Sequence, residues 1–247
     1  MNSATSSLLG RIVTKSGGYT LSLLWFFASG VCHQWPAHCL HYDGKPLPLC
    51  ARCSGTFLGI QLALLTLWIC GEGRASLLPD RRTAALLAVG PIVWAVDGVN
   101  STLGWLRGAT LWYDTNNTIR LLTGMANGLA VGCLLYPVYH GVLWGQTEKR
   151  RVLENKWPLA IIGLMGFLVA AGMLWGKGAP YALWIFLTVG ATAASLTLVN
   201  ALLIVLLLQK EGLARQWVEL LPYLAVGLIA TLGETASLAS VRYFLGA

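Results

Sequence analysis

Long apolar blocks separated by short polar connections make up the chain from about residue 19 onward. Blocks of about 17 to 25 apolar residues match the hydrocarbon core of a bilayer. Trp and Tyr recur near the block ends, as in the interfacial aromatic belts of membrane proteins. The pattern predicts an all-α integral membrane protein, a bundle of about seven transmembrane helices. We expect these helices at residues 19–35, 54–71, 83–103, 118–143, 157–175, 181–208 and 219–243.

Composition agrees with this pattern. The 247 residues are 56% hydrophobic and only 11% charged, whereas soluble domains carry about 25% charged residues. No connection between the blocks approaches the 50 or so residues that a structured soluble domain needs. The expected partner is therefore the lipid bilayer. The net charge of +7 does not indicate nucleic acid, because Lys and Arg flanking membrane helices explain it.

Lys and Arg residues fall mainly in alternate connections, and this asymmetry predicts the orientation of the bundle. The N-terminal tail and the second, fourth and sixth connections carry eleven of them, and the other side carries six. The positive-inside rule then places the N-terminus in the cytoplasm and the C-terminus outside the cell membrane. We expect a cytoplasmic tail at 1–18, a four-helix half at 19–145 and a three-helix half at 146–247.

Four of the six cysteines and three of the four histidines lie within one short window after the first block. The predicted topology puts this window on the extracytoplasmic side. A Cys-x-x-Cys pair with a remote Cys-His pair can supply the tetrahedral Cys₃His set that binds Zn²⁺. The expected metal ligands are Cys32, His33, Cys50 and Cys53. Three further donors in the window, His38, Cys39 and His41, fall outside this set.

Polar residues gather at the same level of three other helices. Asp97 and Asn100 share a face near the end of the third helix, and Asn117 and Arg120 share a face at the start of the fourth. Glu234 lies in the outer half of the last helix. Charged residues are costly against lipid, so these side chains are expected to face the bundle interior or a water-filled cavity.

Two interpretations of these polar residues stay open. In the first, they are internal ties, with Asp97 paired to Arg120 and Glu234 paired to Arg242. In the second, they line a polar cavity beneath the cysteine window that receives a lipid or another amphiphile. Arg120 would then bind an anionic head group and Asp97 would act as base or orienting group. The remaining expected substrate contacts are Asn100, Asn117 and Glu234.

The cysteine window also has alternatives to a metal site. The outside of the cell permits disulfides, so Cys50 and Cys53 could exchange thiol and disulfide in a quinone-coupled oxidoreductase, with Cys32 and Cys39 as a second pair. Histidines have no part in that chemistry. The window could also be a structural staple in a protein without enzymatic activity, or in a transporter.

Two packing predictions follow from single helices. Gly55, Gly59 and Ala63 form a small-xxx-small face on the second helix, which favours close contact with another helix. His140 lies near the cytoplasmic end of the fourth helix, where we expect a solvated or helix-end histidine.

Several of these motifs resemble a family of prokaryotic multi-pass membrane proteins, domain of unknown function 2085. They are Cys32-His33, the string PLCARCSG at 48–55, Asp97-Gly98, and the Asn-x-x-Arg-x-x-Thr-Gly pattern at 117–124. The resemblance covers roughly residues 30–130, the first four helices, and the last three carry no motif of this kind. It implies no activity. It does imply a prokaryotic plasma membrane and one functional unit formed by Cys32, His33, Cys50, Cys53, Asp97, Asn117 and Arg120.

Overall fold

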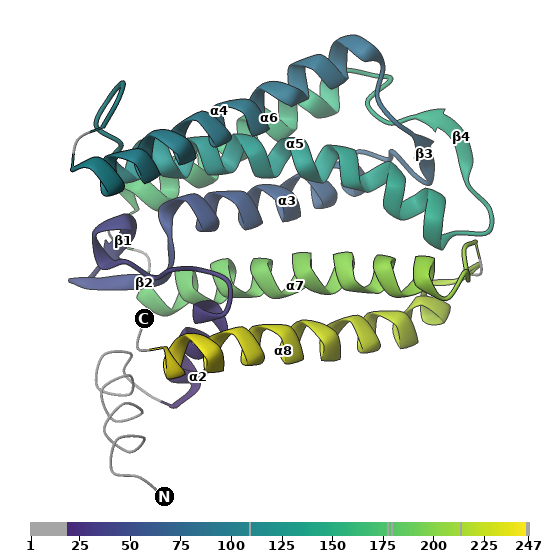
Figure 1. The fold of residues 1–247 in the computed structure, drawn as a ribbon. Helices are drawn as coiled ribbons and strands as arrows, with labels where there is room; N and C mark the ends of the chain where they lie inside the picture. Colours follow the sequence, from purple (N-terminus) through teal and green to yellow (C-terminus); the bar gives the residue numbers. More distant parts are fainter. Residues whose placement is uncertain (1–18, 109, 177, 179, 213, 246–247) are drawn as a thin grey trace, which may run out of the picture.

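The computed structural model describes the chain apart from residues 1–18, 109, 177, 179, 213 and 246–247, and it is an all-α bundle (Figure 1). Six of the described helices are long and apolar enough to cross a membrane. The expected all-α membrane fold is therefore confirmed, whereas the expected tail at 1–18 lies outside the described residues. The helices are α2 (Tyr19–Ser29), α3 (Ala51–Ile69), α4 (Arg81–Arg107), α5 (Asn117–Leu143), α6 (Trp157–Trp175), α7 (Tyr181–Leu207) and α8 (Leu221–Phe244).

A short hairpin, which the sequence pattern did not predict, lies between the first two helices. Strand β1 (Cys39–Tyr42) pairs antiparallel with β2 (Lys45–Cys50), after a 3-10 turn η1 (Pro36–His38). The two residues between the strands, Asp43 and Gly44, both have positive φ angles of 51° and 73°. This is the combination that a two-residue hairpin turn requires. The first helix accordingly ends at Ser29, and Cys32 and His33 follow it rather than belong to it.

The opposite end of the bundle is closed by a second small sheet. Strand β3 (Ala75–Leu77) pairs in parallel with β4 (Glu148–Arg151), and Figure 1 shows this sheet at the far end of α3 and α5 from the β1–β2 hairpin. Arg150 forms ion pairs with Glu72 and Glu148 there. We call the two ends of the bundle the hairpin end and the β3–β4 end.

Side-chain caps set where three of the long helices begin. The Cys50 sulfur accepts the Cys53 N–H at the start of α3. Asp80 caps α4 through the Thr83 N–H, and Asn116 caps α5 through the Ile119 N–H at 2.9 Å. Such caps satisfy backbone donors that a helix leaves unpaired in its first turn.

Helices α3 and α5 approach each other through glycines on both sides. A Cβ atom placed on Gly59 would lie 2.8 Å from the Met125 carbonyl oxygen, below any ordinary contact distance. Gly124 and Gly128 face the α3 backbone in the same way, at Arg52 and Thr56. The close contact predicted for the small face of α3 is thus confirmed, and its partner is a glycine face on α5.

The last two helices pack against each other and return to the hairpin end. Helix α8 runs beside α7, and its C-terminal part lies next to α2 (Figure 1). Gly30 allows this contact, because a Cβ there would meet the Thr235 backbone. Residues from both halves of the chain therefore meet around the cysteine window.

Candidate functional site

Three cysteines meet at the hairpin end. Cys50 caps α3, Cys53 lies in the first turn of α3, and Cys32 follows α2. Their sulfur atoms all lie within 4.8 Å of one another, and Cys32 and Cys50 are buried. In a tetrahedral zinc site with Zn–S bonds of about 2.3 Å, sulfurs are about 3.8 Å apart. The three thiols thus lie within about 1 Å of the separation that one tetrahedral ion imposes.

Hydrogen bonds to Cys32 favour its thiolate. The Cys32 sulfur accepts the backbone N–H of Cys50 at 3.2 Å. The thiols of Cys50 and Cys53 also donate to it and lower the pKa of Cys32 well below its ordinary value, against the effect of burial. A thiolate is the form that binds metal and the form that acts as a nucleophile.

His33 lies at the edge of the three-sulfur group and contacts a second histidine. Its Nδ1 is 4.0 Å from the Cys32 sulfur, and its Nε2 shares a 3.0 Å hydrogen bond with Nδ1 of His38. The His38 ring stacks on Trp35 with 5.7 Å between ring centroids. Burial, followed by the positive charge of Arg120, lowers the pKa of His38 to about 4, which keeps the ring neutral.

The other two donors of the window point elsewhere. Cys39 pairs with Cys50 across the hairpin, but its thiol donates to the Trp35 carbonyl at 3.2 Å. Burial raises the pKa of the Cys39 thiol to about 12. His41 is exposed, and its Nδ1 contacts the Cys39 carbonyl oxygen at 3.1 Å. Neither residue belongs to the three-sulfur group.

Asp97 pairs with Arg52, not with Arg120 as the first interpretation predicted. The Arg52 guanidinium bonds to both the side chain and the backbone carbonyl of Asp97, whose side chain is 0% exposed. Tyr113 donates its hydroxyl to the same carboxylate at 3.0 Å. Arg52 is close enough because the glycine contact draws the start of α3 against α5, beside α4. Arg52, which lies between Cys50 and Cys53, is thereby held in place by the buried Asp97 carboxylate.

Arg120 is 8% exposed and forms no ion pair with a carboxylate among the described residues. It donates to Asn117 Oδ1 and to Ser101 Oγ, both at 3.1 Å, and its buried Nε has no partner. Asn117 in turn donates to the carbonyls of Ala37 and Cys39. Asn117 therefore joins α5 to the cysteine window, while the Nε–H group of Arg120 has no hydrogen-bond acceptor.

A polar cleft adjoins the cysteines. It consists of two hollows of about 280 and 220 Å³ that share three lining residues, His38, Ser101 and Trp105. The first hollow is also lined by His33, Trp35, Thr102 and Arg52. The second is also lined by Arg120, Gly104, Thr110, Asp114 and Thr115. We call these two hollows together the hairpin-end cleft, and its walls combine two arginines, two histidines and two tryptophans.

Asn100 and Glu234, both expected substrate contacts, lie elsewhere. Asn100 is fully buried, and its amide organises the loop before α5. It donates to the Tyr113 carbonyl and the Thr115 hydroxyl and accepts the N–H groups of two further loop residues. Glu234 accepts a hydrogen bond from Asn200 at 3.1 Å. Neither residue lines the hairpin-end cleft.

Arg242 does not pair with Glu234, contrary to the first interpretation. Its guanidinium donates to the backbone carbonyls of Ser29, Cys32 and His33. The last turn of α8 thereby holds the segment that carries the first cysteine. Sequence reasoning gave no such role to Arg242 or Arg52, because their partners are backbone carbonyls and a carboxylate on another helix, which no local pattern marks.

Comparison with known proteins recovers the resemblance in the motif-bearing half. Residues 32–134 match the model of a family described as "Predicted membrane protein (DUF2085)". The resemblance expected for roughly residues 30–130 is thus confirmed. The DUF2085 segment contains all three clustered cysteines, Asp97 and Arg120.

The relatives found carry no assigned activity. An uncharacterized protein of Methanothermobacter thermautotrophicus is 29% identical over 118 residues, which cover 46% of this chain and 91% of the relative. An uncharacterized protein of Methanocaldococcus jannaschii is 25% identical over 121 residues, 49% of this chain and 71% of the relative. No solved structure matches the chain. Most of each relative thus corresponds to about half of this membrane protein.

Proposed function

We propose that this membrane protein binds one Zn²⁺ ion through Cys32, Cys50 and Cys53, with His33 as the fourth ligand. The three sulfurs gathered at the start of α3 carry the proposal. A short side-chain movement would bring His33 Nδ1, now 4.0 Å from the Cys32 sulfur, into the ligand set. His38 would then accept from the other ring nitrogen of His33, as partners of metal-bound histidines commonly do.

We further propose that the hairpin-end cleft receives the anionic head group of a lipid or another amphiphile. Arg120 supports this because it is buried, has no carboxylate partner among the described residues and has an unpartnered Nε. Trp35 and Trp105 flank the opening with apolar surface suited to the start of an acyl chain. His33 lies in the same wall, so a head group bound there would lie beside the metal.

The residues divide into two kinds under this proposal. Arg120 and Ser101 would touch the head group, and Zn²⁺ held by four protein ligands would fix the cysteine segment and His33 beside it. Asp97 does not line the cleft and is bonded to Arg52 and Tyr113. We therefore assign Asp97 a positioning role through Arg52, in place of the role of base considered from the sequence.

The metal proposal is tested by the zinc content of protein purified without chelator, with the thiols of a parallel sample alkylated at cell lysis so that any disulfide is recorded before reductant is added. We expect about one zinc per chain, its loss in Cys53→Ser, and its retention in Cys70→Ser, which alters a cysteine at the other end of α3. Thiol labelling of the metal-free protein should recover the reactivity of Cys32, Cys50 and Cys53. Metal-free protein with a Cys50–Cys53 disulfide would instead support the oxidoreductase alternative. Metal-free protein with three unreacted thiols would contradict both.

The head-group proposal is tested with short-chain soluble lipids. Dihexanoyl phosphatidic acid should bind more tightly than dihexanoyl phosphatidylcholine, measured by quenching of tryptophan fluorescence. Arg120→Gln should weaken the binding of phosphatidic acid by about tenfold or more, as expected for a lost charge-assisted hydrogen bond. Arg107→Gln, at an exposed position at the end of α4, is the matched control. Equal binding of both lipids, or no effect of Arg120→Gln, would contradict the proposal.

A further inference from the structure

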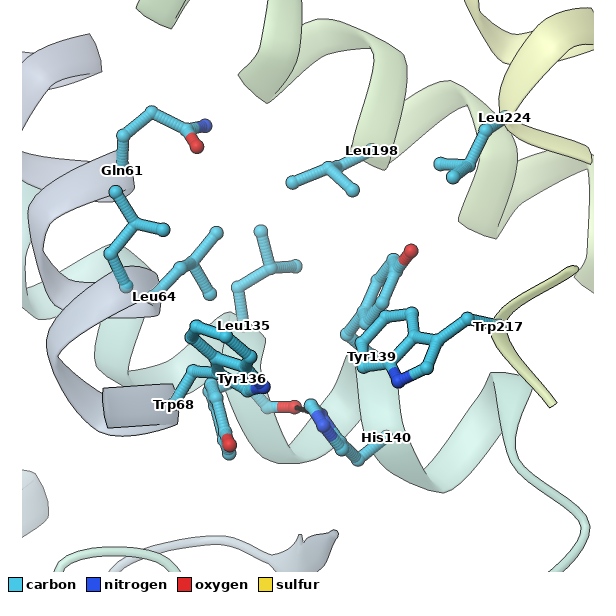
Figure 2. A pocket seen from close by; sticks show the side chains of 11 residues that line it. Gln61, Leu64, Trp68, Leu135, Tyr136, Tyr139, His140, Leu198, Trp217 and Leu224 are labelled. Atoms are coloured by element: carbon cyan, nitrogen blue, oxygen red, sulfur yellow. Dashed lines mark hydrogen bonds between the residues drawn. The ribbon is translucent and has the colours of Figure 1, made fainter. Parts of the chain in front are cut away.

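A second cavity lies toward the β3–β4 end, between the α3–α5 pair and the α7–α8 pair. It has a volume of about 520 Å³, within the usual range for small-molecule sites. Around it, Figure 2 shows side chains from α3, α5, α7, α8 and the 3-10 turn η2 (Trp217–Leu220) that precedes α8. Much of its wall is apolar or aromatic, including Leu64, Trp68, Leu135, Leu198, Trp217 and Leu224. We call this space the aromatic cavity.

Two nearly buried polar side chains of α5 line the aromatic cavity without a full set of partners. His140 is 5% exposed and stacks on Tyr136. Its Nδ1 lies 3.0 Å from the Tyr136 carbonyl oxygen, so Nδ1 carries the proton and Nε2 is a bare acceptor. Tyr139 is 9% exposed. Among the described residues, neither His140 Nε2 nor the Tyr139 hydroxyl has a hydrogen-bond partner. His140 lies in the last turn of α5, as one of the two expectations had it, but its side chain is buried rather than solvated.

Two polar groups of neighbouring residues already have partners. Tyr136 donates its hydroxyl to the Gly73 carbonyl at 2.8 Å, and Gln61 donates to Ser195 at 2.9 Å. Among the described residues, the free hydrogen-bonding groups of the cavity include His140 Nε2, the Tyr139 hydroxyl and the indole N–H groups of Trp68 and Trp217. A buried polar group without a partner costs free energy, so this arrangement suits a ligand that supplies a donor and an acceptor.

The lining also restricts the charge and shape of a ligand. No Lys, Arg, Asp or Glu lines the aromatic cavity, so a charged head group would lose hydration without gaining a counter-charge. Water would find few partners along walls made chiefly of leucine and aromatic rings. Trp68 and Trp217 lie near the ends of candidate membrane-crossing segments, where aromatic side chains of membrane proteins commonly face the lipid head groups.

We propose that the aromatic cavity binds a neutral single-chain lipid alcohol. The hydroxyl group of such a lipid can donate to His140 Nε2 and can accept from a donor such as Tyr139, while its chain lies against the leucines and tryptophans. This site is independent of the zinc proposal, because it lies at the other end of α3 and α5 from the three cysteines and shares no residue with the hairpin-end cleft.

The test uses protein in nanodiscs and a dodecanol that carries a photoreactive diazirine in its chain. After illumination, mass spectrometry should find the label on the α3 and α5 segments at 61–68 and 135–140, and excess dodecanol should remove it. The matched diazirine dodecanoate, charged at neutral pH, should label these segments at least about fivefold less. Equal labelling by the two probes would overturn the proposal, because it would show that bulk acyl chains fill the cavity.

Two variants separate specific binding from general lipid contact. Leu198→Trp should fill the cavity and abolish labelling, whereas Leu168→Trp, on a lipid-exposed position of α6, should leave it unchanged. His140→Phe keeps an aromatic ring without the Nε2 acceptor and should reduce labelling about fivefold, as expected for one lost hydrogen bond. Labelling that stays at the level of the parent protein in His140→Phe, or in folded Leu198→Trp, would contradict the proposed site. Should Leu198→Trp fail to fold, His140→Phe decides the matter.

Discussion

Gly124 is the position where a single added methyl group tests how the helix contact supports the cysteines. A Cβ atom at Gly124 would lie 3.0 Å from the Arg52 carbonyl carbon and closer still to its oxygen. Arg52 stands between Cys50 and Cys53 and is bonded to Asp97. Gly124→Ala should therefore push α5 away from the first turn of α3 and disturb both the ion pair and the spacing of the sulfurs.

The size of the effect follows from the displacement that is needed. Ordinary van der Waals contact begins at 3.4 Å, so the carbonyl carbon alone must move by 0.4 Å (3.4 − 3.0), and the oxygen by more. Overpacking of this kind costs about 1–3 kcal/mol in protein interiors. The helix propensity of alanine would offset up to about 1 kcal/mol. We expect a net loss of about 1–2 kcal/mol.

The assay compares Gly124→Ala with Gly190→Ala by thermal unfolding in detergent, followed by tryptophan fluorescence. Gly190 lies on α7, and among the described residues no neighbouring element has an atom within 4 Å of an added Cβ, so its alanine variant should be no less stable than the parent protein. Alkylation of Cys53 should also become faster in Gly124→Ala only. If the two variants have equal stability and equal Cys53 alkylation, the close contact does not support the site and the reasoning fails.

Three further outcomes follow from individual contacts. Asp97→Asn should lower the free energy of unfolding by about 3 kcal/mol, because it leaves the Arg52 charge without its partner. Chemical unfolding measures this loss. A double variant, Asp97→Asn with Arg52→Met, that is no more stable than Asp97→Asn alone would argue against the ion pair. Asn100→Ala should lower the free energy of unfolding by about 1–3 kcal/mol, because it leaves two loop N–H groups without an acceptor. The loss should appear as faster proteolysis at 108–116, and unchanged proteolysis would refute the prediction. Arg242→Gln should weaken zinc retention against a chelator by about tenfold or more, since it frees the carbonyl of Cys32; unaltered retention would show that α8 does not hold the site.

The helices could be predicted from the sequence because bilayer thickness fixes how long an apolar block must be. The predicted block 157–175 coincides with α6, and 181–208 differs from α7 by one residue. The first block was predicted too long, since apolar residues beyond Ser29 continue into the turn before the hairpin. The hairpin itself was missed because Pro46 and Pro48 make β2 resemble a loop.

The three-cysteine group was predictable because its members are local to one window and to one helix start. The partners of the charged residues were not. Asp97 and Arg120 lie at the same level on adjacent helices, yet Arg52 takes the carboxylate because glycines bring α3 closer than side-chain spacing alone suggests. The burial of His140 was missed because the cavity beside it is completed by Leu198, Trp217 and Leu224, which lie far along the chain.

The contact of Arg242 with the Cys32 carbonyl joins positions 210 residues apart, and this has a consequence for biosynthesis. A ribosome makes the cysteine segment early and Arg242 almost last among the residues described here. Until α8 has entered the membrane, the carbonyls after α2 must be held by water or by the insertion machinery. The arrangement of Cys32 described here is therefore completed only after α8 has been made and inserted.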